Sequence, residues 1–146
     1  MDNIILQAHR GFAYLILLLV AVFIIALVTV MLGNSGKVNK LLRKATLFTM
    51  IFFHVQFLAG LLMLFVRPGF MNTINEIGMG GLMKNADLRF NYIEHPFSMF
   101  IAAVLMTIVN KKVKTNDRIS VGIAVLAVIA LLLFGYAFPF SKLFGN

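Results

Sequence analysis

The chain has 146 residues, of which 61% are hydrophobic, and a formal net charge of +8 at pH 7. A soluble domain of this length would leave too much apolar surface in water, so the composition excludes an ordinary soluble protein and predicts an integral membrane protein. Cysteine is absent, which excludes disulfides, thiolate metal sites and covalent c-type haem attachment. The basic residues lie between hydrophobic runs, which favours contacts with the lipid bilayer and its anionic headgroups over nucleic-acid binding.

Four apolar runs follow one another along the chain and predict four membrane-spanning helices. We expect these spans at about residues 4–32, 45–66, 90–110 and 119–140. The third run, Pro96 to Val109, is shorter than the roughly 20 residues that a span needs, so its helix is expected to begin near Arg89–Tyr92 or to end within residues 110–112. Backbone amides in lipid must be satisfied internally, so the predicted fold class is all-α. Residues 1–146 would form one domain, an up-down four-helix bundle in the membrane.

The connections between the runs carry the signal for orientation. Residues 33–44 and 110–118 each contain four basic residues, whereas residues 67–94 contain three basic and three acidic residues. The positive-inside rule places the two basic connections in the cytoplasm, and we expect the cytoplasmic (inner) membrane as the location. Residues 67–94, which we interpret as a glycine-rich loop, and both the N- and C-termini would then lie on the outer, periplasmic side.

Three histidines, His9, His54 and His95, lie on three of the four predicted spans. Ionisable side chains within a membrane are costly, and they are functional by default. His54 falls near the middle of the second span, and the other two fall near the outer ends of the first and third spans. At about 1.5 Å per residue, His54 and His95 differ in depth by roughly 5–10 Å. A helix tilt of about 20° absorbs part of that difference, so we expect the histidines to converge in the outer half of the bundle.

The neighbours of these histidines favour a cofactor between the helices. Ser98 and Ala102 share a helix face with His95, and small residues one turn from a ligand leave room for a flat macrocycle. Gln56 and Glu94 are candidate hydrogen-bond partners that would orient an imidazole. Basic and aromatic residues at the predicted outer boundary are placed to receive haem propionates, which favour guanidinium partners: Arg10, Arg67, Arg89, Tyr14 and Tyr92.

Each of these residues also has a simpler interpretation. His54 would serve equally as an interhelical hydrogen-bond partner or in a proton relay or quinone site, and His9 and His95 would be solvated if they lie at the membrane interface. Interfacial arginines anchor most membrane proteins. Nine methionines, several of them in residues 67–94, raise copper(I) as a second cofactor candidate. Methionine is also a common apolar filler, which weighs against the copper interpretation.

Three segments carry a resemblance to a known family: AHRGFAYLILLL at the start, HVQFLAGLLMLF in the second span and RFNYIEHPFSMFIAAVLMTI in the third. The chain resembles a family of small four-helix bacterial membrane proteins described as cytochrome b-like. The shared pattern is a histidine followed by an arginine in helix one, H-x-Q-x-L/F-x-G in helix two and E-H at the start of helix three. It covers nearly the whole chain. The resemblance implies non-covalent haem b at His9, His54 and His95, with Arg10, Gln56 and Glu94 beside them.

A more distant similarity links the chain to copper-resistance D-type membrane proteins and to the four-helix membrane protoporphyrinogen oxidases. The shared features are the size of the bundle and a histidine near the start of helix one. The other motifs of those proteins do not match, so no enzymatic activity and no catalytic residue are transferred.

We therefore predict a membrane-embedded b-type haem protein that transfers electrons. Haem iron in low-spin electron transfer takes two imidazole ligands, and we expect His54 and His95 as these metal ligands, with His9 as a substitute ligand or a hydrogen-bond donor to a propionate. Other membrane subunits of a respiratory complex, or quinone, would be its partners. The alternatives are a cofactor-free accessory subunit and a porphyrin- or copper-handling membrane protein. The residues expected around the cofactor are His9, Arg10, Gln56, Arg89, Tyr92 and Glu94.

Overall fold

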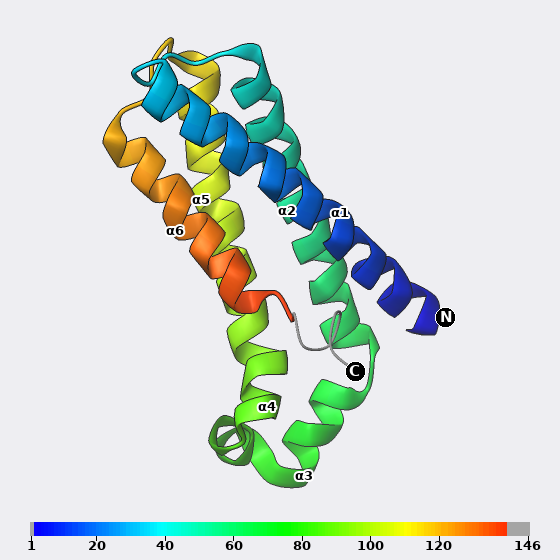
Figure 1. Cartoon of the computed structure of the whole chain (residues 1–146). Helices are drawn as coiled ribbons and strands as arrows, with labels where there is room; N and C mark the ends of the chain where they lie inside the picture. The colour runs from blue at the N-terminus through cyan, green and yellow to red at the C-terminus, as the bar shows by residue number, and fades with distance from the viewer. Residues whose placement is uncertain (1, 140–146) are drawn as a thin grey trace.

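The computed structural model describes residues 2–139 (Figure 1). In this range the chain forms helices and turns, with one isolated antiparallel bridge between Lys37 and Arg118 and no strand. The prediction of an all-α fold is confirmed for this part of the chain. The elements are α1 (Asp2–Val28), η1 (Thr29–Gly33), α2 (Lys40–Val66), α3 (Gly69–Lys84), α4 (Ala86–Arg89), η2 (Phe90–Glu94), α5 (His95–Thr115) and α6 (Val121–Ala137).

Three helical segments are long and apolar enough to cross a membrane: Ile4–Gly33, Lys40–Val66 and Ala86–Thr115. They correspond to the first three predicted spans. The third begins before Arg89 and ends after residue 112, so the short apolar run is extended at both of the ends that we considered. α6 is apolar but has 17 residues, fewer than the roughly 20 of a complete span. The last residue of the predicted fourth span, residue 140, and the C-terminus lie outside the described residues.

The helices pack in chain order, α1 on α2, α2 on α5, and α5 on α6, and they run in alternating directions (Figure 1). Large side chains such as Phe23, Phe53 and Met106 fill the centre. Small side chains are buried as well, among them Ala102 on α5 and Ala127 on α6, and small residues let helix backbones approach closely.

The outer surfaces of these helices are apolar. Leu18 on α1, Leu58 on α2 and Leu132 on α6 are 62%, 62% and 67% exposed, and many other large aliphatic side chains are exposed beside them. A soluble protein rarely exposes apolar patches of this extent, and a helix that is hydrophobic all round is typical of a membrane protein. The exposed surface therefore agrees with the apolar composition of the spans.

At one end of the molecule the two basic connections are joined by backbone hydrogen bonds. Val38 N donates to Asp117 O at 2.8 Å, and Ile119 N donates to Gly36 O at 3.0 Å. Gly36 has φ +83°, and a Cβ atom there would lie 2.8 Å from the Ile119 carbonyl oxygen. Only glycine tolerates both the backbone angle and the close approach. We call this the bridged end.

At the opposite end, residues 67–94 are mostly helical, whereas we interpreted them as a loop. α3 begins after Pro68, and Thr73 Oγ1 donates to the Gly69 carbonyl at 2.7 Å. α3 is interrupted at Gly78, which has φ +71°, so the glycines produce a kink rather than an unstructured loop. The Asn85 side chain accepts hydrogen bonds from the first backbone N–H groups of α4 and caps that helix.

Candidate functional site

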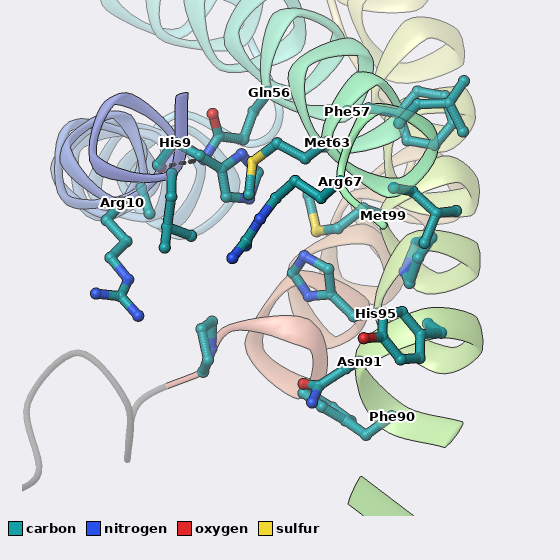
Figure 2. Close-up of a pocket in the computed structure, with 18 of the residues that line it drawn as sticks. His9, Arg10, Gln56, Phe57, Met63, Arg67, Phe90, Asn91, His95 and Met99 are labelled. Carbon is teal, nitrogen blue, oxygen red and sulfur yellow. Dashed lines mark hydrogen bonds between the residues drawn. The ribbon is translucent and has the colours of Figure 1, made fainter. Parts of the chain in front are cut away.

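A cavity of about 760 Å³ lies between the helices at the end opposite the bridged end (Figure 2). Its volume falls in the range of about 300–1,000 Å³ that is typical of small-molecule and cofactor sites. The wall is formed by the first turns of α1, the second half of α2, the start of α3, the turn η2, the start of α5 and the end of α6. Residues of the wall with polar or sulfur-containing side chains are His9, Arg10, Gln56, Met63, Arg67, Asn91, Tyr92, His95 and Met99.

Two of the three histidines line this cavity, one from each side. The ring centres of His9 on α1 and His95 on α5 are 6.3 Å apart, and the ring planes are inclined by 76°. Both rings border the same space in Figure 2. The two residues are far apart in the sequence and lie on helices that both pack against α2, so their approach depends on the packing of three helices and not on local structure.

His95 is oriented by the end of α6. Its Nδ1 lies 2.6 Å from the carbonyl oxygen of Ala137, so Nδ1 carries the proton that is donated to that oxygen, and in the neutral ring Nε2 carries the lone pair. Metal-bound histidines almost always donate their second ring N–H to a carbonyl or carboxylate in this way. The π-helical turn η2 immediately precedes His95, and such turns are frequent at functional sites.

His9 is held against α2. Gln56 Nε2 donates to the His9 carbonyl oxygen at 2.6 Å, and the ring lies so close to Gly60 that a Cβ atom there would be 3.3 Å from His9 Cε1. The Nδ1 atom of His9 is buried and has no hydrogen-bond partner within the described residues. An unsatisfied buried polar atom is destabilising by about 1–3 kcal/mol, so His9 lies in a less favourable environment than a histidine with two hydrogen-bond partners.

The spacing of the two rings fits a metal ion held between them. Two imidazoles that bind one ion from opposite sides at about 2.0–2.1 Å have ring centres roughly 6–6.5 Å apart, and the observed separation is 6.3 Å. Rotation about a metal–nitrogen bond does not change this separation, so the inclination of 76° is compatible with it.

The ligand count indicates which kind of metal centre fits. Within the described part of the chain, no group of three or more His, Cys, Asp or Glu side chains is placed to hold a metal ion. Two imidazoles alone do not complete the four-coordinate shell of zinc. Two imidazoles would be enough to hold a haem iron, because the porphyrin supplies the remaining ligands. The thioethers of Met63 and Met99 line the same cavity, and together with the imidazoles they form a donor set that suits copper(I).

Cationic and polar groups lie around the two rings. Arg67, at the end of α2, extends towards the space between His9 and His95, and Arg10 extends from α1 farther out (Figure 2). Tyr92 and Asn91 belong to the same wall. Guanidinium groups are the preferred partners of carboxylates, so Arg67 and Arg10 are suited to bind carboxylate groups of a ligand in the cavity.

Four of the predicted cofactor-binding residues, His9, Arg10, Gln56 and Tyr92, line the cavity, together with the predicted metal ligand His95. Arg89 and Glu94 do not belong to its wall. They form an ion pair at 2.7 Å, and Tyr136 donates to the other Glu94 oxygen at 2.6 Å. Their network joins the π-helical turn to α6, next to His95.

His54, predicted as a metal ligand, is not brought together with His95. It does not line the cavity, and its ring lies between α2 and α5. Nδ1 is 2.8 Å from the Met50 carbonyl oxygen, and Nε2 is 3.0 Å from Thr107 Oγ1. Both nitrogens of His54 thus have protein partners, and the histidine that approaches His95 is His9.

Met99, Gly60 and Met63 are among the wall residues that were not expected as site residues. Met99 lies four residues after His95 and shares its helix face, and that spacing was a usable signal. Gly60 closes the H-x-Q-x-L-x-G segment, and its lack of a side chain admits the His9 ring. Met63 had no signal in the sequence. In Figure 2 the sulfur atoms of Met63 and Met99 both point towards the cavity.

Comparison of the chain with protein-family models, with curated proteins and with solved structures finds no match. The resemblance to cytochrome b-like proteins therefore stays a prediction from sequence. The functional interpretation depends on the geometry of the cavity.

Proposed function

We propose that this chain is a four-pass protein of the bacterial cytoplasmic membrane that binds one non-covalent haem b between His9 and His95 and transfers electrons. The observation that carries the proposal is the 6.3 Å separation of the two imidazoles across a cavity of about 760 Å³. No third His, Cys, Asp or Glu side chain joins the two imidazoles among the described residues, which agrees with a metal whose other ligands come from a porphyrin. His9 takes the place that the sequence suggested for His54.

The proposed orientation follows from charge. The bridged end contains the eight basic residues of the two short connections, so the positive-inside rule places it in the cytoplasm. The haem cavity then lies in the periplasmic half of the membrane, and α6 forms the fourth pass. Electron donors and acceptors would be other membrane proteins or quinone, because the helices described here leave little mass outside the membrane.

In this proposal several residues at the cavity have separate roles. His9 and His95 would hold the metal, Gln56 fixes the backbone of His9, and the Ala137 carbonyl fixes the tautomer of His95. Arg67 and Arg10 would hold the carboxylates of the porphyrin. When it is bound, haem supplies one-electron exchange at iron, and the surrounding apolar side chains exclude water.

The visible spectrum of the full-length protein, purified in detergent from haem-replete cells, tests the proposal. We expect a Soret band and, after reduction with dithionite, sharp α and β bands typical of two imidazole ligands. Pyridine haemochrome analysis is expected to give one haem b per chain. A protein purified without colour that shows no bound-haem spectrum after haemin is added and the unbound haemin is removed would refute the proposal. It would favour a cofactor-free accessory subunit.

A second candidate function has one specific observation in its favour. The thioethers of Met63 and Met99 border the cavity together with the two imidazoles (Figure 2), and sulfur and imidazole ligands select copper(I). Metal analysis separates the two functions. One equivalent of copper without haem, lost in a Met63→Leu/Met99→Leu variant, would support copper handling instead of electron transfer by haem.

A further inference from the structure

A second cavity, of about 290 Å³, lies at the bridged end, where α5 ends and α6 begins. It is separate from the histidine cavity and does not depend on the proposed haem function. Its wall combines two cationic side chains, an amide and a hydroxyl with two isoleucines: Lys112, Arg118, Asn116, Ser120, Ile119 and Ile123. Such a set presents several hydrogen-bond donors and two positive charges to a small space.

The surroundings of this cavity are strongly cationic. The bridged end has eight basic residues and one acidic residue, Asp117. The ion pair that the described residues form, Arg89 with Glu94, lies at the other end of the molecule. The basic side chains of the bridged end therefore have no carboxylate partner within the described part of the chain. Basic residues there are Lys37, Lys40, Arg43, Lys44, Lys111, Lys112, Lys114 and Arg118.

The backbone around the cavity is fixed by hydrogen bonds. Arg118 Nη1 donates to the Ser35 carbonyl at 3.1 Å, which anchors one arm of the guanidinium. Asn116 Nδ2 donates to the Lys112 carbonyl at 2.9 Å, and Ser120 Oγ accepts from Ile123 N at 3.3 Å. A site whose walls are already ordered loses little conformational entropy when a ligand binds.

We propose that this cavity binds the phosphate group of an anionic phospholipid. Charge complementarity supports a phosphate, because a lysine and an arginine line a space that no described carboxylate neutralises. The position supports a lipid. Val121 and Val125, on the first two turns of α6, are 70% and 49% exposed, so an apolar surface for acyl chains begins beside the polar cavity. Basic sites next to membrane-spanning helices recognise anionic headgroups in this way.

Lipid retention tests this proposal. The full-length protein is reconstituted in phosphatidylcholine nanodiscs that contain a minor fraction of phosphatidylglycerol, extracted in a mild detergent and analysed by native mass spectrometry. We expect phosphatidylglycerol to be retained in preference to phosphatidylcholine. Lys112→Gln is expected to lower this preference about tenfold, and Lys112→Gln/Arg118→Gln to lower it further, because each change removes a charge-assisted hydrogen bond to the phosphate.

The matched control is Lys40→Gln/Lys44→Gln, which removes the same number of charges from the same end but outside the cavity wall. It is expected to change the preference much less than the cavity pair. An equal loss in both pairs would show a diffuse charge effect and overturn the proposal, as would the absence of any lipid preference. Displacement of phosphatidylglycerol by millimolar inorganic phosphate would identify a site for free phosphate and would also overturn it. Arg118 has a structural hydrogen bond, so the decisive single variant is Lys112→Gln.

Discussion

The surroundings of His9 and His54 differ, although both residues lie on helices that are long and apolar enough to span a membrane and that pack against each other. Both nitrogens of His54 have partners, the Met50 carbonyl oxygen and the Thr107 hydroxyl. The Nδ1 atom of His9 is buried without a partner in the described residues, and its ring borders a large cavity. A histidine within a membrane is therefore not a ligand site by itself. The partners of its two nitrogens decide between a structural and a functional role.

His9 and His54 also differ in the hydrogen-bond partners that the protein supplies to their ring nitrogens. A neutral imidazole has one donor and one acceptor nitrogen. At the contact between α2 and α5, which we call the seam, the Met50 carbonyl and the Thr107 hydroxyl are the partners of the two His54 nitrogens. The cavity supplies the matching carbonyl for His95, through Ala137, but none for His9 Nδ1. Both nitrogens of His54 are therefore satisfied within the protein, whereas His9 keeps one buried nitrogen that no described residue satisfies.

The largest expected effect is the loss of haem when a cavity histidine is removed. His95→Ala and His9→Ala are each expected to reduce haem retention to a residual level, because one axial ligand is lost. His54→Ala, the matched control from the seam, is expected to retain haem fully. Haem content per chain is measured by pyridine haemochrome after purification. Added imidazole is expected to restore the low-spin spectrum of His9→Ala.

The opposite result for haem content would contradict the assignment of His9 as a ligand and of His54 as a structural residue. If His54→Ala lost the haem while His9→Ala retained it, the pairing of His54 with His95 expected from the sequence would be correct, and the cavity would not hold the iron.

A smaller effect on haem retention is expected from substitutions of Gly60, which lies against the His9 ring. A Cβ atom on Gly60 would lie 3.3 Å from His9 Cε1, so Gly60→Val is expected to displace the ring and lower haem retention severalfold. Gly60→Ala is expected to retain haem with an altered low-spin spectrum. The control is Gly11→Ala on α1, where nothing lies within 4 Å of a new Cβ atom. It should leave the spectrum unchanged. If Gly60→Val and the unaltered protein gave the same spectrum, His9 would not be a ligand of the iron.

Sequence patterns were sufficient to place most of the helices and part of the site. The apolar runs located the three long spans, because burial in lipid leaves a signal in composition at every turn of the helix. They also placed His9, Arg10 and Tyr92 at the same end of the molecule, where all three line the cavity. Those assignments needed only depth along a helix, and depth follows from counting residues.

The pairing of the histidines was not predictable in the same way. Successive residues of a helix point in directions about 100° apart, and α2 is apolar on all sides, so its sequence does not indicate which face meets α1 and which meets α5. The structure turns Gln56 and Gly60 towards His9 and turns His54 towards Thr107. The helical course of residues 69–84 was missed for a different reason. Glycine-rich composition weakens a helix, and here it produced a kink at Gly78 and not a loop.

A further prediction concerns Arg67 in the cavity wall. Arg67→Gln removes the guanidinium that extends into the cavity but keeps hydrogen-bond donors, and it is expected to weaken haem binding about tenfold, because a hydrogen bond to a charged group contributes about 1.5–3 kcal/mol. Haemin titration into the apoprotein measures the dissociation constant. Lys84→Gln at the end of α3, a basic residue outside the cavity wall, is the control. If the two variants bound haemin with equal affinity, Arg67 would not bind the haem carboxylates.

The smallest expected effect belongs to the seam and measures the structural role of His54 directly. Thr107 Oγ1 lies 3.0 Å from His54 Nε2 and 2.8 Å from the Ala103 carbonyl, so its single proton is shared between two acceptors. A double-mutant cycle of His54→Ala and Thr107→Val, followed by unfolding in mixed micelles, is expected to give a coupling of about 0.6 kcal/mol, the average for interhelical hydrogen bonds in a membrane. Haem content should be equal in all four proteins. A coupling indistinguishable from zero would mean that the α2–α5 contact does not use this hydrogen bond. His54 would then be an ionisable residue in the membrane without a measurable structural role, and the contrast with His9 would disappear.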